Sequence, residues 1–227
     1  MKPWELIDSE TAPGGNAAME LLRRDDEYVI RIDGQTLMST RTHGSEDALA
    51  NIAFERLEQT ESCRVLVGGL GMGFTAAAAL KSLPPQGELV VAEFSPAVIR
   101  WNRGPAGDAA GNPLHDERLR LYDGDVIDEI KGPQASWSAI LLDTDNGPTA
   151  LSSPGNQWLY AAKGLAALYL ALKPGGVLTV WSANEDASFT HRMEKAGFVT
   201  EVVEVRARGK RGARHRVWVG IRPGKGN

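Results

Sequence analysis

A glycine-rich loop stands between a predicted strand and a predicted helix. It reads Val67-Gly68-Gly69-Leu70-Gly71-Met72-Gly73, after the apolar run Arg64 to Gly68 and before an alanine-rich helix. Glycines let the backbone turn sharply and approach a ligand closely, and the start of the helix offers unpaired N–H groups. Glu93 ends the next predicted strand, 20 residues after Gly73, close to the spacing of about 20 at which an acid reaches ribose hydroxyls. The pattern predicts a nucleotide-like ligand.

Carboxylates also follow the third and fourth predicted strands. Asp125 is expected either to accept a hydrogen bond from an adenine amino group, with Val126 packed on the ring, or to cap the helix that begins there. Asp143 and Asp145 can hold a cationic amine and act as a general base, or be ordinary turn residues. Ligands of open α/β sheets bind outside the carboxyl ends of the strands, so these residues are expected in one pocket.

The elements that must position these residues form an alternation of strands and helices. Apolar runs separated by helical patterns predict an α/β fold with a doubly wound, mostly parallel sheet. The predicted strands are Arg64 to Gly68, Glu88 to Phe94, Leu119 to Tyr122, Ser138 to Asp143 and Val177 to Ser182. The predicted helices are Phe74 to Leu83, Pro96 to Arg103, Trp158 to Leu172 and Asp186 to Ala196.

Glycines and prolines mark the end of the sheet. Lys173 to Gly176 is expected to end a helix and turn into the fifth strand. Val199 to Arg206 and Arg216 to Arg222 are expected to form a C-terminal antiparallel hairpin around a basic loop. The residues expected to face inward there are Val217, Val219 and Ile221.

The region before Ser62 has a different pattern. Glu27 to Asp33 and Gln35 to Ser39 predict a hairpin, and Ser45 to Gln59 predicts an amphipathic helix with Ser45 as its N-cap. Thr11 to Ala17 is expected to be a flexible turn. We therefore divide the chain into a small β extension, residues 1–42, and a ligand-binding domain, residues 43–227.

The composition excludes several classes of protein. The 227 residues carry a net charge of −4, which argues against a dedicated nucleic-acid binder. One segment, 206–216, holds six basic residues and no acid, which leaves 19 basic against 29 acidic residues elsewhere. This basic loop is expected to be a solvated hairpin tip or to bind phosphate or RNA. The lone Cys63 predicts a reducing, cytoplasmic location, and no segment approaches the roughly 20 apolar residues of a membrane span.

The glycine loop and its context resemble a known fold. The loop has the form G-x-G-x-G through Gly69, Gly71 and Gly73, whereas the dinucleotide form is G-x-G-x-x-G. With the later glutamate and the C-terminal hairpin, it is similar to the class I S-adenosylmethionine-dependent methyltransferase fold. The resemblance implies S-adenosyl-L-methionine rather than NAD as the cofactor. The residues alone leave open that the glycines only allow tight packing of the strand against the helix.

Within that fold the chain resembles the spermidine synthase branch over most of its length. The similar segments are Ile32 to Gln35, Gly68 to Gly73, Glu93 with Pro96 to Ile99, Gly124-Asp125, and Asp143. In that family, such residues surround the adenosyl group, and the acid after strand four handles the substrate amine. The residues expected to bind the cofactor are Gln35, Gly68, Gly69, Gly71, Gly73, Glu93, Asp125 and Val126.

Three departures from that branch touch the polyamine side of the pocket. Aminopropyltransferases carry an aspartate in G-G-G-D-G-G, where this chain has Gly71 after Leu70. They carry D-x-x-D after strand four, whereas this chain has D-x-D, and the tyrosine of their Y-H-E segment appears as Ser45, beside Glu46 and Asp47. The adenosyl side is kept, so the sequence favours a methyl donor with a different acceptor.

Scattered histidines and aromatic residues add alternatives. His43 is expected to be a surface or capping residue, or to lie over the pocket mouth, and no histidine spacing fits a metal site. Trp158, Tyr160 and Trp181 are expected in the core or on the wall of an acceptor site.

We predict an S-adenosylmethionine-dependent methyltransferase that acts on a small nucleophile by in-line displacement, without a metal. Asp143 and Asp145 are the predicted catalytic residues. The alternatives are aminopropyl transfer from decarboxylated S-adenosylmethionine to a polyamine, and a non-catalytic adenosyl-binding or RNA-associated module. The expected partner is a small-molecule acceptor, and no membrane association is expected. Nucleic-acid binding and formation of a homodimer stay open.

Overall fold

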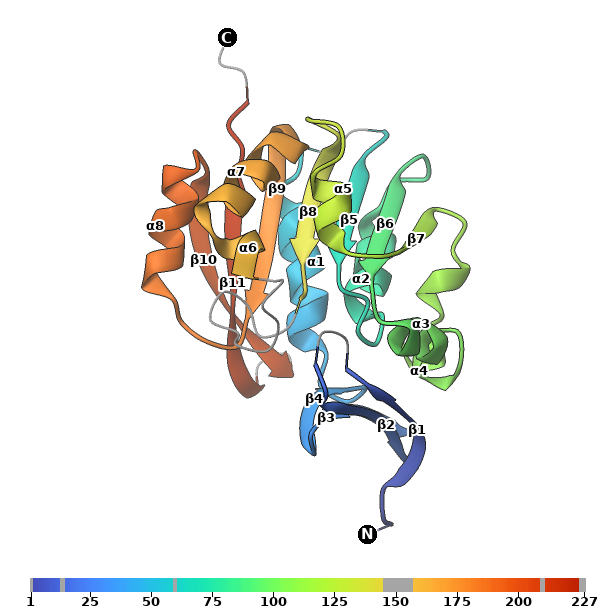
Figure 1. Ribbon diagram of the computed structural model, residues 1–227. Helices are drawn as coiled ribbons and strands as arrows, with labels where there is room; N and C mark the ends of the chain where they lie inside the picture. The colour runs from blue at the N-terminus through green and yellow to red at the C-terminus, as the bar shows by residue number, and fades with distance from the viewer. Residues whose placement is uncertain (1, 13–14, 59–60, 145–156, 209–210, 225–227) are drawn as a thin grey trace.

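A computed structural model describes residues 2–12, 15–58, 61–144, 157–208 and 211–224. Within these residues the chain forms two β-sheets (Figure 1). The larger sheet has seven strands in the order β10-β11-β9-β8-β5-β6-β7, and the smaller has four in the order β1-β2-β3-β4. Helices cover the larger sheet, so the predicted α/β fold with a mostly parallel, Rossmann-like sheet is confirmed.

The elements have the following bounds. The strands are β1 (Glu5–Thr11), β2 (Ala18–Arg24), β3 (Glu27–Ile32), β4 (Gln35–Ser39), β5 (Arg64–Gly68), β6 (Glu88–Glu93), β7 (Leu119–Asp123), β8 (Trp137–Leu142), β9 (Leu172–Ser182), β10 (Val199–Arg208) and β11 (Arg211–Ile221). The helices are α1 (Gly44–Arg56), α2 (Phe74–Ser82), α3 (Pro96–Asn102), α4 (Pro105–Ala109), the 3-10 turn η1 (Pro113–His115), α5 (Val126–Ile130), α6 (Gln157–Tyr160), α7 (Ala162–Ala171) and α8 (Ala187–Lys195).

The parallel strands end together at one edge of the seven-stranded sheet. Gly68 at the end of β5 pairs with Ala92 on β6 and with Leu142 on β8. The loops that follow these three strands therefore leave the sheet side by side. β11 runs antiparallel to both β9 and β10, as the C-terminal hairpin predicts.

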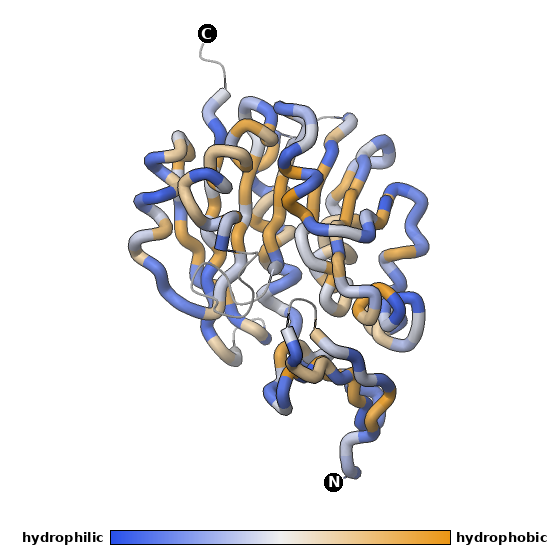
Figure 2. The backbone as a smooth tube through the Cα atoms, in the orientation of Figure 1, coloured by the Kyte–Doolittle hydropathy of each residue, from blue (hydrophilic) through white to orange (hydrophobic). Residues whose placement is uncertain are grey.

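Two apolar layers hold the seven-stranded sheet between its helices. Val65 and Val67 face the core that contains α1, α2 and α3, whereas Leu66 between them faces the core of α5, α7 and α8. Because both faces are buried, the central strands are apolar along their whole length. Figure 2 shows this as hydrophobic segments running through the middle of the sheet.

The four-stranded sheet lies beyond the carboxyl edge of the parallel strands (Figure 1). Its apolar face contributes Met19, Leu21 and Ile30 to the core that contains α1. A polar contact also joins the small sheet to α3, because the Asp8 carboxylate accepts a hydrogen bond from Trp101 Nε1 at 2.7 Å. The small sheet thus forms one wall over the edge where a ligand is expected.

The helices differ from prediction in two places. The N-cap of α1 is His43 and not Ser45, because the backbone N–H groups of Glu46 and Asp47 donate to the His43 carbonyl. The Ser45 hydroxyl instead donates to the Glu46 carboxylate. The single helix expected from Trp158 to Leu172 is two helices, since Ala161 adopts an extended backbone between α6 and α7.

The strands near the C-terminus are longer than predicted. Lys173 to Gly176 belongs to β9 rather than to a turn, because Gly175 and Gly176 exchange backbone hydrogen bonds with Arg222. β10 continues to Arg208 and β11 begins at Arg211, so most of the expected basic loop is paired strand.

Burial along β11 also differs from the expected alternation. Val217 and Val219 are buried as predicted and Ile221 is half-buried. Trp218 is buried on the opposite face, where α8 covers the strand and Thr190 accepts from its Nε1 atom. No helix among the described residues is long and apolar enough to cross a membrane.

Candidate active site

The glycine loop lies directly against the end of β8. Gly69 has a φ of +93°, and a Cβ atom there would lie 2.5 Å from the backbone oxygen of Asp143. Gly71, with a φ of +51°, would place a Cβ 2.7 Å from Met38 Sδ. Side chains at these two positions would be strained and would collide with their neighbours. The glycines thus bring the loop backbone close to both the fourth strand and the small sheet.

A pocket opens at the carboxyl edge of the sheet, lined by Gly69, Gly71, Glu93, Asp125 and Asp143 among others. Two other predicted glycines of the loop do not line it. Gly68 faces the side chains of Val126 and Leu142, and Gly73 is the N-cap of α2. Both shape the strand–loop–helix turn. Gln35 begins β4 and is exposed, and the residues of that strand that line the pocket are Leu37 and Met38.

Glu93 is buried at the end of β6 and holds the glycine loop. Its carboxylate accepts hydrogen bonds from the backbone N–H of Leu70 at 2.9 Å and of Ser95 at 2.8 Å. Burial raises the pKa of Glu93, and the N–H donors oppose that rise. The same carboxylate lines the pocket, where the spacing from the glycines predicts a ribose.

Asp125 has the capping role that one of its two expectations gave it, and its role toward adenine stays a prediction. Its Oδ1 atom accepts from the backbone N–H of Ile127 at 2.9 Å, so it is the N-cap of α5. It also lines the pocket beside Val126. Next to them, Phe94 is 48% exposed although it is a large apolar residue. An exposed aromatic ring at the pocket is a surface that an adenine can cover.

Asp143 lies directly after β8, and its carboxylate is buried. The Thr75 hydroxyl donates to its Oδ2 atom at 2.6 Å. Loss of hydration, followed by the negative charge of Glu46, raises the pKa of Asp143 to about 7, and the Thr75 hydrogen bond opposes this rise. A carboxylate with such a pKa can accept a proton near neutral pH.

Glu46 is a functional candidate that sequence reasoning missed. It lies in the first turn of α1, where Ser45 donates to its Oε2 atom at 2.6 Å, and burial raises its pKa. Together with Asp143 it lines two adjoining pockets. The only signal in the sequence was the position of Glu46 in the segment that departs from Y-H-E.

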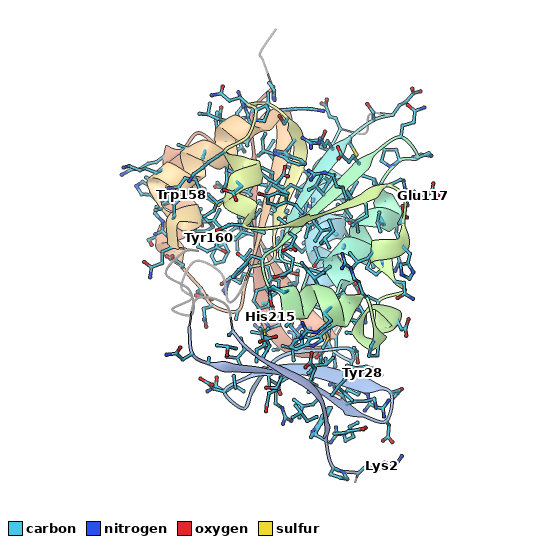
Figure 3. All side chains as sticks on the ribbon, turned by 45° about the vertical axis from the view of Figure 1, so that its right-hand side comes forward. Lys2, Tyr28, Glu117, Trp158, Tyr160 and His215 are labelled. Carbon is cyan, nitrogen blue, oxygen red and sulfur yellow. The ribbon has the colours of Figure 1, made fainter. Side chains whose placement is uncertain are left out.

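The C-terminal hairpin approaches the same place. His215 Nδ1 lies 3.0 Å from Ser45 Oγ, and its ring centroid lies 4.8 Å from that of Trp181. Figure 3 shows His215 near the junction of the two sheets. Desolvation lowers the pKa of His215, so the ring is neutral at pH 7.

The remaining candidates lie elsewhere or outside the described residues. Asp145 falls outside the described residues. His43 stacks on Phe74 at 3.9 Å, and Tyr160 is a buried core residue whose hydroxyl lies 2.7 Å from Thr144 Oγ1. Trp158 packs under Lys131. In the part of the chain that the structure describes, no group of three or more His, Cys, Asp or Glu residues could hold a metal ion.

The chain thus has a Rossmann-like α/β fold with a pocket at the carboxyl edge of its parallel strands, the edge at which ligands of such folds bind. No family model matches the sequence. No curated protein matches it either. Comparisons with solved structures, in contrast, find the same fold.

Three of the similar solved structures are described as spermidine synthases or a probable spermidine synthase. A spermidine synthase in complex with the transition-state analogue AdoDATO has a TM-score of 0.77 and 19% identity, over 96% of this chain and 73% of that chain. The enzyme from Thermotoga maritima has a TM-score of 0.75 and 18% identity, over 96% of this chain and 72% of that chain. A probable spermidine synthase from Corynebacterium glutamicum has a TM-score of 0.65 and 16% identity, over 97% and 81%. The chain has the fold of the spermidine synthase branch, as its motifs predict.

Proposed function

We propose that the protein transfers an aminopropyl group from decarboxylated S-adenosylmethionine to an amine. The charge of the pocket at the carboxyl edge carries the proposal. Among its described lining residues, the charged ones are Glu93, Asp125 and Asp143, and all three are carboxylates. The decarboxylated cofactor has a cationic sulfonium and a cationic amine, which carboxylates stabilise. S-adenosylmethionine also has a carboxylate, which they would repel. The charge of the pocket therefore favours the decarboxylated form.

The structural relatives support the same choice. They are named as spermidine synthases, and one of them holds the analogue AdoDATO. This similarity favours aminopropyl transfer over the methyl transfer that we predict from the sequence.

The cofactor fits the residues at the carboxyl edge. The backbone of Gly69 and Gly71 allows close approach. In the proposed complex Glu93 would accept hydrogen bonds from the ribose hydroxyls and Asp125 one from the adenine amino group. Apart from Ser95 and Thr144, the other side chains of the lining are apolar and would exclude water from the cofactor; they include Met19, Ile30, Ile32, Val98 and Val126.

When bound there, the cofactor supplies an electrophilic carbon on a sulfonium, which leaves as a neutral thioether when the acceptor nitrogen displaces it. Asp143 accepts the proton that the nitrogen loses on forming its new bond, because its pKa of about 7 suits a general base at neutral pH. Thr75 orients that carboxylate through its hydrogen bond. Glu46 adds a second negative charge that stabilises the acceptor amine.

Glu46 also offsets a departure from the spermidine synthase pattern. Where aminopropyltransferases carry an aspartate in the glycine loop, this chain has Gly71, and the Met38 side chain occupies the space beside it. In the narrow pocket beside Gly71, the carboxylate that accompanies Asp143 is Glu46, which comes from α1. The same Gly71 makes methyl transfer from S-adenosylmethionine the second candidate function.

The products separate the two candidates. Purified protein is incubated with decarboxylated S-adenosylmethionine or with S-adenosylmethionine, plus a set of amines, and the nucleoside products are quantified by mass spectrometry. Aminopropyl transfer releases methylthioadenosine, and methyl transfer releases S-adenosylhomocysteine. We expect methylthioadenosine from the decarboxylated cofactor only.

Binding and variants complete this test. Calorimetry is expected to give tighter binding of the decarboxylated cofactor than of S-adenosylmethionine. Asp143→Asn should lower turnover at least about 100-fold. Asp123→Asn, at the end of β7, should leave it unchanged because Asp123 lines none of the pockets described above. Release of S-adenosylhomocysteine alone would establish the second candidate, and no affinity for either cofactor would overturn both.

A further inference from the structure

A second cavity adjoins the cofactor pocket. It has a volume of about 720 Å³ and lies between β4, the start of α1, the end of β9 and the hairpin β10–β11. Met38 and Asp143 line both this cavity and the cofactor pocket. A molecule in the second cavity therefore reaches the carboxylate that we propose as the general base. Its volume lies in the range of roughly 300 to 1,000 Å³ that is usual for small-molecule sites.

The two ends of this cavity carry opposite charges. Glu46 and Asp143 lie at the end that meets the cofactor pocket, and Arg208 lines the cavity from the outer part of β10. His215 pairs with Val205 across the hairpin, three positions before Arg208. At about 3.3 Å per residue along a strand, Arg208 lies on the order of 10 Å farther out than that pair. The cavity is thus acidic at its inner end and basic at its outer end.

Arg208 differs from Arg214 and Arg216 on the partner strand of the hairpin. Arg214 pairs with Glu204 at 3.5 Å, and Arg216 pairs with Glu185. Within the described residues, the ion pairs of the hairpin do not include Arg208, which is exposed at the cavity. Its guanidinium is therefore available to an anion that enters.

The wall between the two charged ends combines apolar side chains with the hydroxyl-bearing side chains of Thr36, Ser39 and Thr42. Leu37, Met38, Trp181 and Ala207 line it, and the neutral His215 adds a polar edge. The apolar part of this wall suits a chain of methylene groups. Among the described residues that line this cavity, and with His215 uncharged, Arg208 supplies the positive charge. A planar guanidinium also matches a carboxylate in shape.

From this cavity we infer that the acceptor is an aliphatic amine that carries a carboxylate at its far end. The amine meets Glu46 and Asp143 beside the cofactor, and the carboxylate meets Arg208. The inference rests on the proposed function for the fate of the amine, but the charge preference of the cavity is measurable on its own. A plain diamine would instead place a cationic end against Arg208.

Two probes of equal length test the charge preference directly. 6-Aminohexanoate and 1,6-diaminohexane differ only in whether one end is a carboxylate or an amine. Calorimetric titration of the protein, with methylthioadenosine present, is expected to give about tenfold tighter binding of 6-aminohexanoate. Shorter and longer ω-amino acids then give the distance between the two charged ends. 6-Aminohexyl phosphate serves as the phosphate counterpart.

Charge reversal at Arg208 provides the decisive comparison. Arg208→Glu is expected to invert the preference toward 1,6-diaminohexane, and Arg208→Gln to remove it. The matched control Arg214→Gln, which lies on the same hairpin outside this cavity, should keep it. Circular dichroism checks that each variant is folded.

Equal binding of both probes by the native protein, or tighter binding of the diamine or the phosphate, would overturn the inference. So would a preference that Arg208→Glu leaves unchanged. Release of methylthioadenosine from decarboxylated cofactor, measured in parallel, reports on the proposed function separately. Turnover without a carboxylate preference refutes only the inference. A carboxylate preference without turnover of any amine refutes only the aminopropyl transfer.

Discussion

His215 Nδ1 on β11 lies 3.0 Å from the Oγ atom of Ser45 on α1, although the two residues are 170 positions apart in the chain. Ser45 in turn donates to Glu46 at 2.6 Å. One hydroxyl therefore links the C-terminal hairpin to a carboxylate of the candidate active site. The hairpin and the acids form one cavity because this contact holds them together.

The Ser45 hydroxyl is expected to control the charge of Glu46. Its hydrogen bond lowers the pKa of Glu46 against the larger, opposing effect of burial. Ser45→Ala removes that bond, so the pKa of Glu46 should rise further. Carbon-13 NMR titration of the glutamate carboxyls measures it, with Ser45→Thr as the control that keeps a hydroxyl. An unchanged Glu46 pKa in Ser45→Ala would contradict the assignment.

Asp143 should make the protein less stable as the pH rises. Its folded pKa of about 7 lies above its ordinary value of 3.8, so the folded state binds the proton more tightly than the unfolded state. The stabilisation is complete below about pH 4 and is lost as the pH rises through 7. Asp143→Asn should remove this loss, which is at most about 4 kcal/mol for a shift of about three pKa units. Urea unfolding at pH 5 and pH 8 tests it; parallel pH dependences in both proteins would refute it.

Turnover should show the opposite pH dependence. A base must be deprotonated to act, so kcat/KM should rise with pH through a value near 7, the pKa of Asp143. Asp143→Asn should lower kcat at least about 100-fold, as expected when a general base is lost. A pH profile of methylthioadenosine release measures the first effect. A rising limb that persists unchanged in the residual activity of Asp143→Asn would assign the base to another residue.

Alanine variants of Gly69 and Gly34 test whether the close approach of the glycine loop to the Asp143 backbone matters. Both glycines have a positive φ, +93° and +78°, but a Cβ on Gly69 would meet the Asp143 backbone oxygen whereas one on Gly34 would meet nothing within 4 Å. Both alanine variants should lose about 1–2 kcal/mol of stability to backbone strain. Gly69→Ala should lose more and should also lose adenosyl binding. Denaturation midpoints and calorimetry with methylthioadenosine measure both effects; equal behaviour of the two variants would show that the approach is unimportant.

Asp8 should hold the small sheet over the cofactor pocket. Its carboxylate accepts from buried Trp101 at 2.7 Å and from Arg100 at 2.7 Å. Asp8→Ala leaves the indole N–H without its partner, at a cost of about 1–3 kcal/mol. We expect faster hydrogen exchange in β1 and β2 and weaker binding of methylthioadenosine. Glu10→Gln removes only an exposed contact to Arg100 at 3.5 Å and should change neither. Unchanged exchange in Asp8→Ala would rule out this role.

Local sequence signals predicted the fold because they depend on near neighbours. The strand before the glycine loop is a continuous apolar run, and the spacing from Gly73 to Glu93 follows from one strand–helix–strand unit. The hairpin of β10 and β11 was predicted, although its pairing extends to Arg208 because the strands continue where glycine and arginine suggested a loop.

Contacts between distant segments could not be predicted in this way. Glu46 looked like an ordinary acid of a first helical turn, and its proximity to Asp143 depends on how α1 packs behind the sheet. The basic hairpin lies far along the chain from the acidic strand ends, yet Arg208 and Asp143 line the same cavity. Side-chain charge carries no information about which end of a sheet a hairpin will reach, and that depends on the antiparallel pairing with β9.

Met38 connects the small sheet to both ligand spaces. It stands on β4 beside Gly71 and lines the cofactor pocket, the second cavity and the narrow pocket between them. Its unbranched thioether chain can turn without any movement of the backbone. A rotation of the Met38 side chain would change the space in the cofactor pocket and in the second cavity together, so a ligand in one would affect the room left in the other. Binding of the donor and binding of the acceptor would then be coupled through the conformation of one side chain.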